Sequence, residues 1–79
     1  SPSTALNFQL AQTEHVTAYV YDMRGRRVRT LADGSHPAGR HSIPWNGRDD
    51  GGQAVANGVY FMRFQAGETS DTIKLTRID

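Results

Sequence analysis

Apolar and polar residues alternate with a period of two along most of this chain, which is the pattern of half-buried β-strands. No apolar stripe at helical spacing persists beyond one turn. The sets expected to share one strand face are Leu6, Phe8 and Leu10; Val16, Ala18 and Val20; and His41, Ile43 and Trp45. The sets expected to face inward in the last two strands are Tyr60, Met62 and Phe64, and Ile73 with Leu75. The sequence therefore predicts short strands and no helix.

The segments between these strands carry residues that favour tight turns. Asp22 and Gly25 occupy the first and fourth positions of "DMRG", which predicts a type I turn with a left-handed glycine. Residues 66–68, "AGE", predict another tight hairpin. Residues 32–39, "ADGSHPAG", predict a longer exposed loop.

Two positions suggest an irregular strand and an edge strand. Val28 and Leu31 are spaced by three, which indicates a bulge or a strand end. Pro44 has no N–H to give to a ladder, so its strand is expected at a sheet edge. About seven short strands at roughly ten-residue spacing predict an all-β fold, a small antiparallel β-sandwich.

The chain has 79 residues, enough for one domain with a thin core. It has no cysteine, so neither a disulfide nor a thiolate metal site can stabilise it. Its net charge of +1 gives no strong attraction to nucleic acid, and no apolar run approaches a membrane span.

The loop that follows Trp45, "NGRDDGGQ", contains acids and glycines and allows two interpretations. Asp49 and Asp50 could hold Ca²⁺ together with backbone carbonyls, although an arginine stands where an EF-hand needs its third ligand. Alternatively, both carboxylates accept backbone N–H groups in an Asx-type turn. In that case positive φ angles are expected at Gly47, Gly51 and Gly52.

Signatures of catalysis and of metal binding are weak. His15, His36 and His41 are expected in a turn, a loop and a strand, and a third ligand would have to come from far away in the sequence. No nucleophile-elbow sequence accompanies the serines and histidines. We predict that the domain is not an enzyme and has no cofactor.

Strand parity places Tyr19, Tyr21 and Phe61 on outer faces, with Arg63 facing water. If their strands share a sheet, the three rings form an aromatic patch. Such a patch either stiffens the sheet through cross-strand pairs or contacts a protein or a sugar.

The segment "RGRRVR" is the only charge cluster. Arg24 and Arg26 flank Gly25, and Arg27 and Arg29 are expected on one outer face. The cluster either protects a sheet edge from aggregation or binds carboxylates or phosphates of an acidic glycan or a partner protein. No nucleic-acid-binding motif accompanies it.

Three stretches stand in an order and spacing that resemble one family. They are V-Y-D-x-x-G-R at Val20–Arg26, W-x-G-R-D-x-x-G at Trp45–Gly52 and G-V-Y-F at Gly58–Phe61, with "PST" at Pro2–Thr4 before them. The chain resembles the immunoglobulin-like domain of flagellar hook-capping proteins, which overlaps the type A C-terminal sorting domain of the type IX secretion system. The resemblance covers almost the whole chain.

The resemblance implies that residues 1–79 are a single Ig-like C-terminal module of a larger exported protein. Its expected role is noncatalytic sorting or cell-surface attachment, recognised by secretion or envelope machinery at the outer membrane or outside the cell. Lys74 and Arg77 lie where sorting domains carry basic residues in their last strand, whereas Ile78 and Asp79 depart from the more basic ends of such signals.

Two other functions remain open at this point. One is a carbohydrate-binding module that uses Tyr19, Tyr21 and Phe61, and the other is a structural assembly domain of a flagellar hook cap. In each case the architecture is expected to depend on Trp45 plugging one end of the sandwich and on Tyr60 leading the central strand. The glycines expected to shape the turns are Gly25, Gly47, Gly52 and Gly58.

Overall fold

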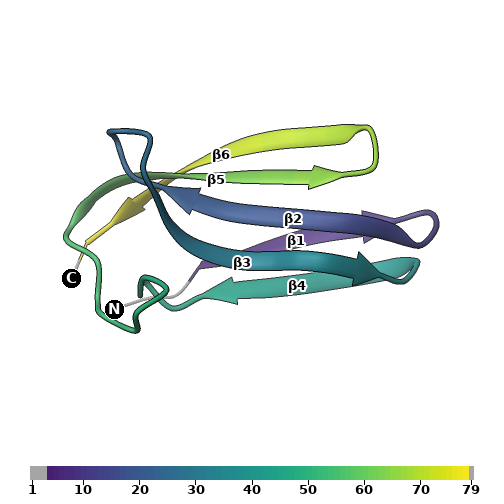
Figure 1. Cartoon of the computed structure of the whole chain (residues 1–79), viewed down its shortest axis with the longest axis horizontal. Coiled ribbons are helices and arrows are strands. Elements are labelled where there is room, and N and C mark those ends of the chain that lie inside the picture. The colour runs from purple at the N-terminus through teal and green to yellow at the C-terminus, as the bar shows by residue number, and fades with distance from the viewer. Residues whose placement is uncertain (1–3, 79) are drawn as a thin grey trace.

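The computed structural model describes residues 4–78, which form six β-strands in two sheets (Figure 1). The strands are β1 (Thr4–Leu10), β2 (Glu14–Tyr21), β3 (Arg27–His36), β4 (Gly39–Trp45), β5 (Gly58–Ala66) and β6 (Thr69–Arg77). No helix occurs in this range, so the all-β prediction is confirmed, with one strand fewer than expected. Pro2 and Asp79, which entered the resemblance, lie outside the described residues.

The two sheets contain two and four strands. β1 and β4 form the smaller sheet, and the larger sheet has the order β3-β2-β5-β6 with all pairs antiparallel. β4 pairs with β1 alone, so Pro44 lies on an edge strand as predicted. Within residues 4–78 no helix is long and apolar enough to cross a membrane.

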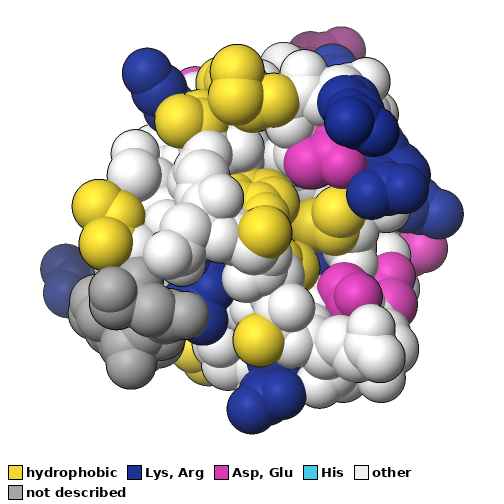
Figure 2. Space-filling view, turned by 90° about the vertical axis from the view of Figure 1, so that its left-hand side faces the viewer, with side chains coloured by type: hydrophobic (Ala, Val, Ile, Leu, Met, Phe, Trp, Pro, Cys, Tyr) yellow, Lys and Arg dark blue, Asp and Glu magenta, His cyan; other side chains and the backbone are white. Residues whose placement is uncertain are grey.

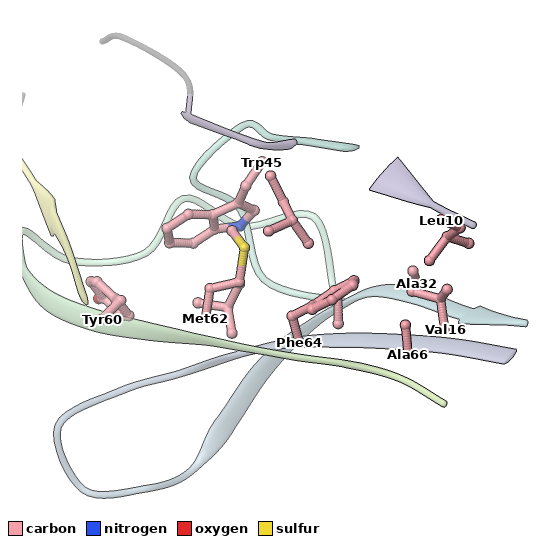
Figure 3. Close-up of a cluster of buried hydrophobic side chains, with 11 residues drawn as sticks. Leu10, Val16, Ala32, Trp45, Tyr60, Met62, Phe64 and Ala66 are labelled. Atoms are coloured by element: carbon pink, nitrogen blue, oxygen red, sulfur yellow. The ribbon is translucent and has the colours of Figure 1, made fainter. Parts of the chain in front are cut away.

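The core lies between the two sheets (Figure 3). Trp45 from β4 lies over Met62 on β5, and Leu10 from β1 lies over Val16, Ala32 and Ala66 of the larger sheet. The side chains buried in this core are Leu6, Leu10, Val16, Ala18, Val20, Ala32, Trp45, Tyr60, Met62, Phe64 and Ala66. The sets expected from period-two alternation are therefore confirmed for β1, β2 and β5.

Ile73 is an exception to this pattern. It pairs with Met62 and so shares the inner face, yet it remains 36% exposed. β6 is the last strand of a four-stranded sheet, and the opposing sheet has only two strands to cover it. Leu75, two residues further along β6, is partly buried against the core.

The prediction of a long loop at residues 32–39 is wrong. β3 continues to His36, and only residues 37 and 38 separate it from β4. Ala32 is buried opposite Ala18, and Asp33 pairs with Thr17, so pairing with β2 holds this segment extended. Ladder hydrogen bonds thus override a composition that is typical of loops.

β3 contains two irregularities that confirm the predicted bulge. The pairing with β2 shifts by one residue at Leu31 and again at Val28. As a result Arg27 stands opposite Tyr21, while Arg29 stands opposite the buried Val20. The prediction that Arg27 and Arg29 share an outer face is therefore wrong, because each extra residue reverses the parity of the strand.

The β2–β3 turn has the predicted chemistry. The Asp22 carbonyl accepts the Gly25 N–H at 3.0 Å, and Gly25 has a φ of 81°. Asp22 Oδ1 accepts the N–H groups of Arg26 at 3.0 Å and of Arg24 at 2.9 Å. The hydrogen bond from the Arg26 backbone, together with that from Arg24 and the charge of the Arg26 guanidinium, holds the pKa of Asp22 below its ordinary value of 3.8.

Candidate functional site

Residues 46–57 form a loop that is folded on itself. The N–H of Asp49 donates to the Gln53 carbonyl at 2.8 Å, and the N–H of Val55 donates to the Gly47 carbonyl at 2.9 Å. Asp49 Oδ1 accepts the N–H groups of Gly51 at 2.9 Å and of Gln53 at 3.0 Å. Asp49 thus makes the Asx-type turn that the sequence indicated.

The same loop is fastened to the outer edge of β3. The N–H of Asp50 donates to the Val28 carbonyl at 3.0 Å, and Asp50 Oδ1 accepts the N–H of Thr30 at 2.9 Å. Arg29 Nη1 donates to the Asp49 carbonyl at 3.2 Å. Because β3 is an edge strand, these bonds satisfy backbone groups that no neighbouring strand reaches.

Trp45 connects this loop to the core. Its side chain is buried, and its Nε1–H donates to the Arg48 carbonyl at 2.9 Å. The indole meets the Tyr60 ring edge to face, with centroids 5.6 Å apart. The Tyr60 hydroxyl donates to the Ala56 carbonyl at 2.7 Å, so both rings bind the loop while filling the core.

The glycines of the loop differ in their backbone conformation. Gly47 and Gly52 have φ angles of 75° and 85°, whereas Gly51 has no positive φ, so the prediction for Gly51 is wrong. Gly47 also lies against the guanidinium of Arg77, where a Cβ would collide with it. Gly58, at the start of β5, has a φ of 151°.

The acidic and histidine side chains contact one another in pairs, such as His36 and His41, whose ring centroids lie 5.2 Å apart. Among residues 4–78 no three His, Cys, Asp or Glu side chains are grouped so that they could hold a metal ion. All three histidines lie in strands, not in the turn and loop predicted for His15 and His36. His15 Nε2 lies 2.9 Å from Asp33 Oδ1, and the His41 ring stacks on Phe8 at 5.1 Å between centroids.

The outer face of the four-stranded sheet carries the predicted aromatic patch. β2 and β5 are neighbours, and Tyr21 pairs directly with Phe61. Tyr19 and Tyr21 meet edge to face at 6.3 Å between centroids. Their strands do share a sheet, so the three half-buried rings lie together.

Two arginines cross this patch diagonally. Arg27 stands opposite Tyr21 but places its guanidinium over Tyr19, with Cζ 4.7 Å from the ring centroid. Arg63 stands opposite Tyr19 but lies over Tyr21, at 5.8 Å. From the sequence, Arg27 is part of the charge cluster that could bind carboxylates or phosphates, but Arg63 is not among the candidates, although outward parity next to Phe61 was a usable signal for that residue.

The other basic candidates lie in different places: Lys74 on this face, Arg77 against the loop at Gly47, and Arg24 and Arg26 in the β2–β3 turn. Lys74 is exposed and pairs with Phe61, whereas Arg77 pairs with Gly58 and is only partly exposed. Arg24 is exposed in the β2–β3 turn, and Arg26 Nε lies 3.3 Å from Asp22 Oδ2. Figure 2 looks at the end of the sandwich that carries this turn, with Lys and Arg side chains gathered at the upper right and acidic side chains beside them.

Comparison with known proteins identifies the family. A family model described as "FlgD Ig-like domain" matches residues 2–71. The chain belongs to this family. The expectation that the domain is not an enzyme agrees with membership of the FlgD Ig-like family.

The chain is also similar to individual FlgD proteins. Over 65 residues the chain is 41% identical to the basal-body rod modification protein FlgD of Salmonella typhimurium and to that of Salmonella typhi. The match covers 81% of this chain and 28% of each relative, so the chain spans just over a quarter of their length. A crystal structure of FlgD from P. aeruginosa aligns with 95% of this chain and 59% of that chain, at a TM-score of 0.69 and 26% identity.

These relatives overturn the leading functional prediction. Sorting by the type IX secretion system or cell-surface attachment was expected because the chain resembles both sorting domains and hook-capping domains. The comparisons support the hook-capping group and not the sorting domains. The matching proteins are FlgD rod modification proteins, so the hook-cap half of the resemblance is the correct one. The error has a physical origin, because the two groups share the fold and its turns, and a shared scaffold does not determine function.

Proposed function

We propose that this domain is a noncatalytic structural module of a FlgD-type protein, and that it serves in flagellar hook capping and rod modification. The observation that carries the proposal is the 41% identity over 65 residues to a basal-body rod modification protein. The aligned region covers 81% of the chain, so it includes most of the strands and the loop that closes the sandwich.

The architecture suits a scaffold. In the loop 46–57 the carboxylates of Asp49 and Asp50 accept hydrogen bonds from backbone N–H groups of the domain itself. Side chains fill the interior between the sheets. The charged side chains of Arg27 and Arg63 lie on the outer face of the four-stranded sheet. A small, internally braced sandwich can hold a surface in a fixed orientation during assembly.

We further propose that residues 1–79 are one domain of a longer exported protein, located outside the cytoplasm with the flagellum. The relatives, which are several times longer than this chain, support a multidomain parent. Its partners would then be proteins of the hook and rod. Binding of a surface glycan by the aromatic patch remains a prediction from the sequence.

The proposal can be tested in the source organism. An in-frame deletion of the codons for residues 4–78 should leave cells without normal hooks when basal bodies are viewed by electron microscopy. The intact gene supplied in trans should restore them. Normal hooks in the deletion strain, with the truncated protein present at the usual level, would overturn the proposal.

A further inference from the structure

We propose that the outer face of the four-stranded sheet is a docking surface for an acidic segment of a protein partner. We call the set Tyr19, Tyr21, Arg27, Phe61, Arg63 and Lys74 the cationic-aromatic face. Nothing in the family assignment specifies this site. The inference goes beyond the proposed function and does not depend on it.

The first argument is the charge of this face. Arg27, Arg63 and Lys74 approach the aromatic rings from β3, β5 and β6, so three cations surround one patch. Within residues 4–78 none of the three forms an ion pair with a carboxylate. Asp33 pairs with Thr17 further along β2, and its Oδ1 lies 2.9 Å from His15 Nε2. Asp71 of β6 borders the same surface as Arg63, where it accepts the N–H of Thr72 and forms no ion pair with Arg27, Arg63 or Lys74. The unneutralised cations therefore favour an anionic partner.

The second argument concerns the type of anion. A guanidinium already lies over one face of each tyrosine ring, and a sugar or a nucleobase would need those ring faces for stacking. The guanidinium N–H groups remain available at the surface, and their planar fork matches a carboxylate in two-point contact. Stacking on tyrosine also reduces the number of conformations that each arginine can adopt. Aspartate and glutamate side chains fit this arrangement better than stacked rings do.

The third argument is the shape of the face. A shallow groove of about 470 Å³ runs across β2, β5 and β6. Its lining includes Tyr19, Tyr21, Arg63 and Thr72. In residues 4–78 no strand covers this side of the sheet, since the two-stranded sheet packs on the opposite face. A peptide segment can therefore lie along the groove with a carboxylate beside Arg63, while Arg27 lies over Tyr19 at the β3 side of the same face.

The test is an NMR titration of the ¹⁵N-labelled 79-residue chain with a short blocked peptide of alternating glutamate and threonine. At about 0.05 M salt, where charge interactions are weakly screened, we expect shifts confined to β2, β5, β6 and the start of β3. The same peptide with glutamine in place of glutamate should bind at least about tenfold more weakly, since it lacks the charges. Equal affinity for the two peptides would overturn the proposal.

Matched variants locate the site. The double variant Arg27→Gln with Arg63→Gln should weaken binding about tenfold, because two exposed charge pairs are lost. Arg40→Gln removes one positive charge from an exposed position of β4 in the other sheet, and it should leave the affinity unchanged. A loss for Arg40→Gln about half as large, in binding free energy, as that of the double variant would show a general effect of net charge and would contradict a defined site.

Two further probes separate the classes of partner. Polygalacturonate and a short DNA duplex are titrated under the same conditions. Either polymer binding more tightly than the glutamate peptide at this face would overturn the assignment to a protein segment. Thermal melts of every variant, measured by circular dichroism, show whether each protein is folded, so that affinities are compared only between folded proteins.

Discussion

The acid-bearing loop 46–57 and the cationic-aromatic face both carry charged side chains, but they use them in opposite ways. In the loop, the carboxylates of Asp49 and Asp50 accept backbone N–H groups, and Trp45 ties the loop to the core. On the sheet face, Arg27 and Arg63 lie on tyrosine rings and have no carboxylate partner within residues 4–78. The acids and glycines of the loop are typical of a binding site, but in the structure the loop stabilises the fold. The charged groups that are free to bind a partner lie on the regular strands β3, β5 and β6.

The largest effect should come from Trp45→Ala. Removing a buried aromatic side chain typically costs about 3 to 5 kcal/mol. Small domains have total stabilities of about 5 kcal/mol, so this variant should retain at most about 2 kcal/mol and should melt at a much lower temperature than the natural protein. Circular dichroism melts measure this directly. An unchanged cooperative transition would show that the loop end does not support the fold.

A smaller effect is expected for Asp50→Ala. The change removes the acceptor of the Thr30 N–H on an edge strand and should lower the free energy of unfolding by about 1 to 2 kcal/mol. Urea denaturation gives the value. Asp50→Asn keeps an oxygen at the Oδ1 position and should recover most of the loss. If both variants are as stable as the natural protein, the hydrogen bond between Asp50 and Thr30 contributes nothing to the free energy of unfolding.

On the sheet face, Arg27→Gln should cost less than about 1 kcal/mol, as is usual for an exposed cation over an aromatic ring. The same urea experiment applies. A loss as large as that of Asp50→Ala would place this arginine among the stabilising contacts and remove the contrast between the two regions.

The smallest effect concerns pH and the β2–β3 turn. The folded-state pKa of Asp22 is lowered by backbone N–H donors, so its contribution to stability is present above the unfolded-state value near 3.8 and is lost as pH falls through the lower folded-state value. Asp22→Asn should therefore reduce the acid-induced loss of stability. Unfolding curves at a series of acidic pH values, with Glu68→Gln as the control, give the comparison. Identical pH profiles for the two variants would contradict this role.

Strand parity was predictable because each buried face imposes its own alternation. Val16, Ala18 and Val20 are fully buried, as their spacing required. The turn at Asp22 was equally local, since the donors it binds lie within four residues. The exposure of Ile73 was not predictable, because it depends on how many strands the opposing sheet has.

The rest of the site depends on contacts between distant residues. The bulges at Val28 and Leu31 reverse the face of Arg29, and the sequence indicated an irregularity without giving its effect on register. Asp50 reaches Thr30 only after the loop has folded back on β3. The diagonal crossing of Arg27 and Arg63 depends on the register of three strands, which no local pattern specifies.

Amide hydrogen exchange of the loop and of β3 tests most directly whether residues 46–57 belong to the structural framework. The N–H of Thr30 donates to Asp50 Oδ1, that of Asp49 to the Gln53 carbonyl and that of Asp50 to the Val28 carbonyl. We expect them to exchange as slowly as the core amides of β2 and β5, because they should open only when the domain unfolds. Rapid exchange of these three amides, at the rate of an unstructured surface loop, would contradict the structural role of the loop and reopen its interpretation as a binding site.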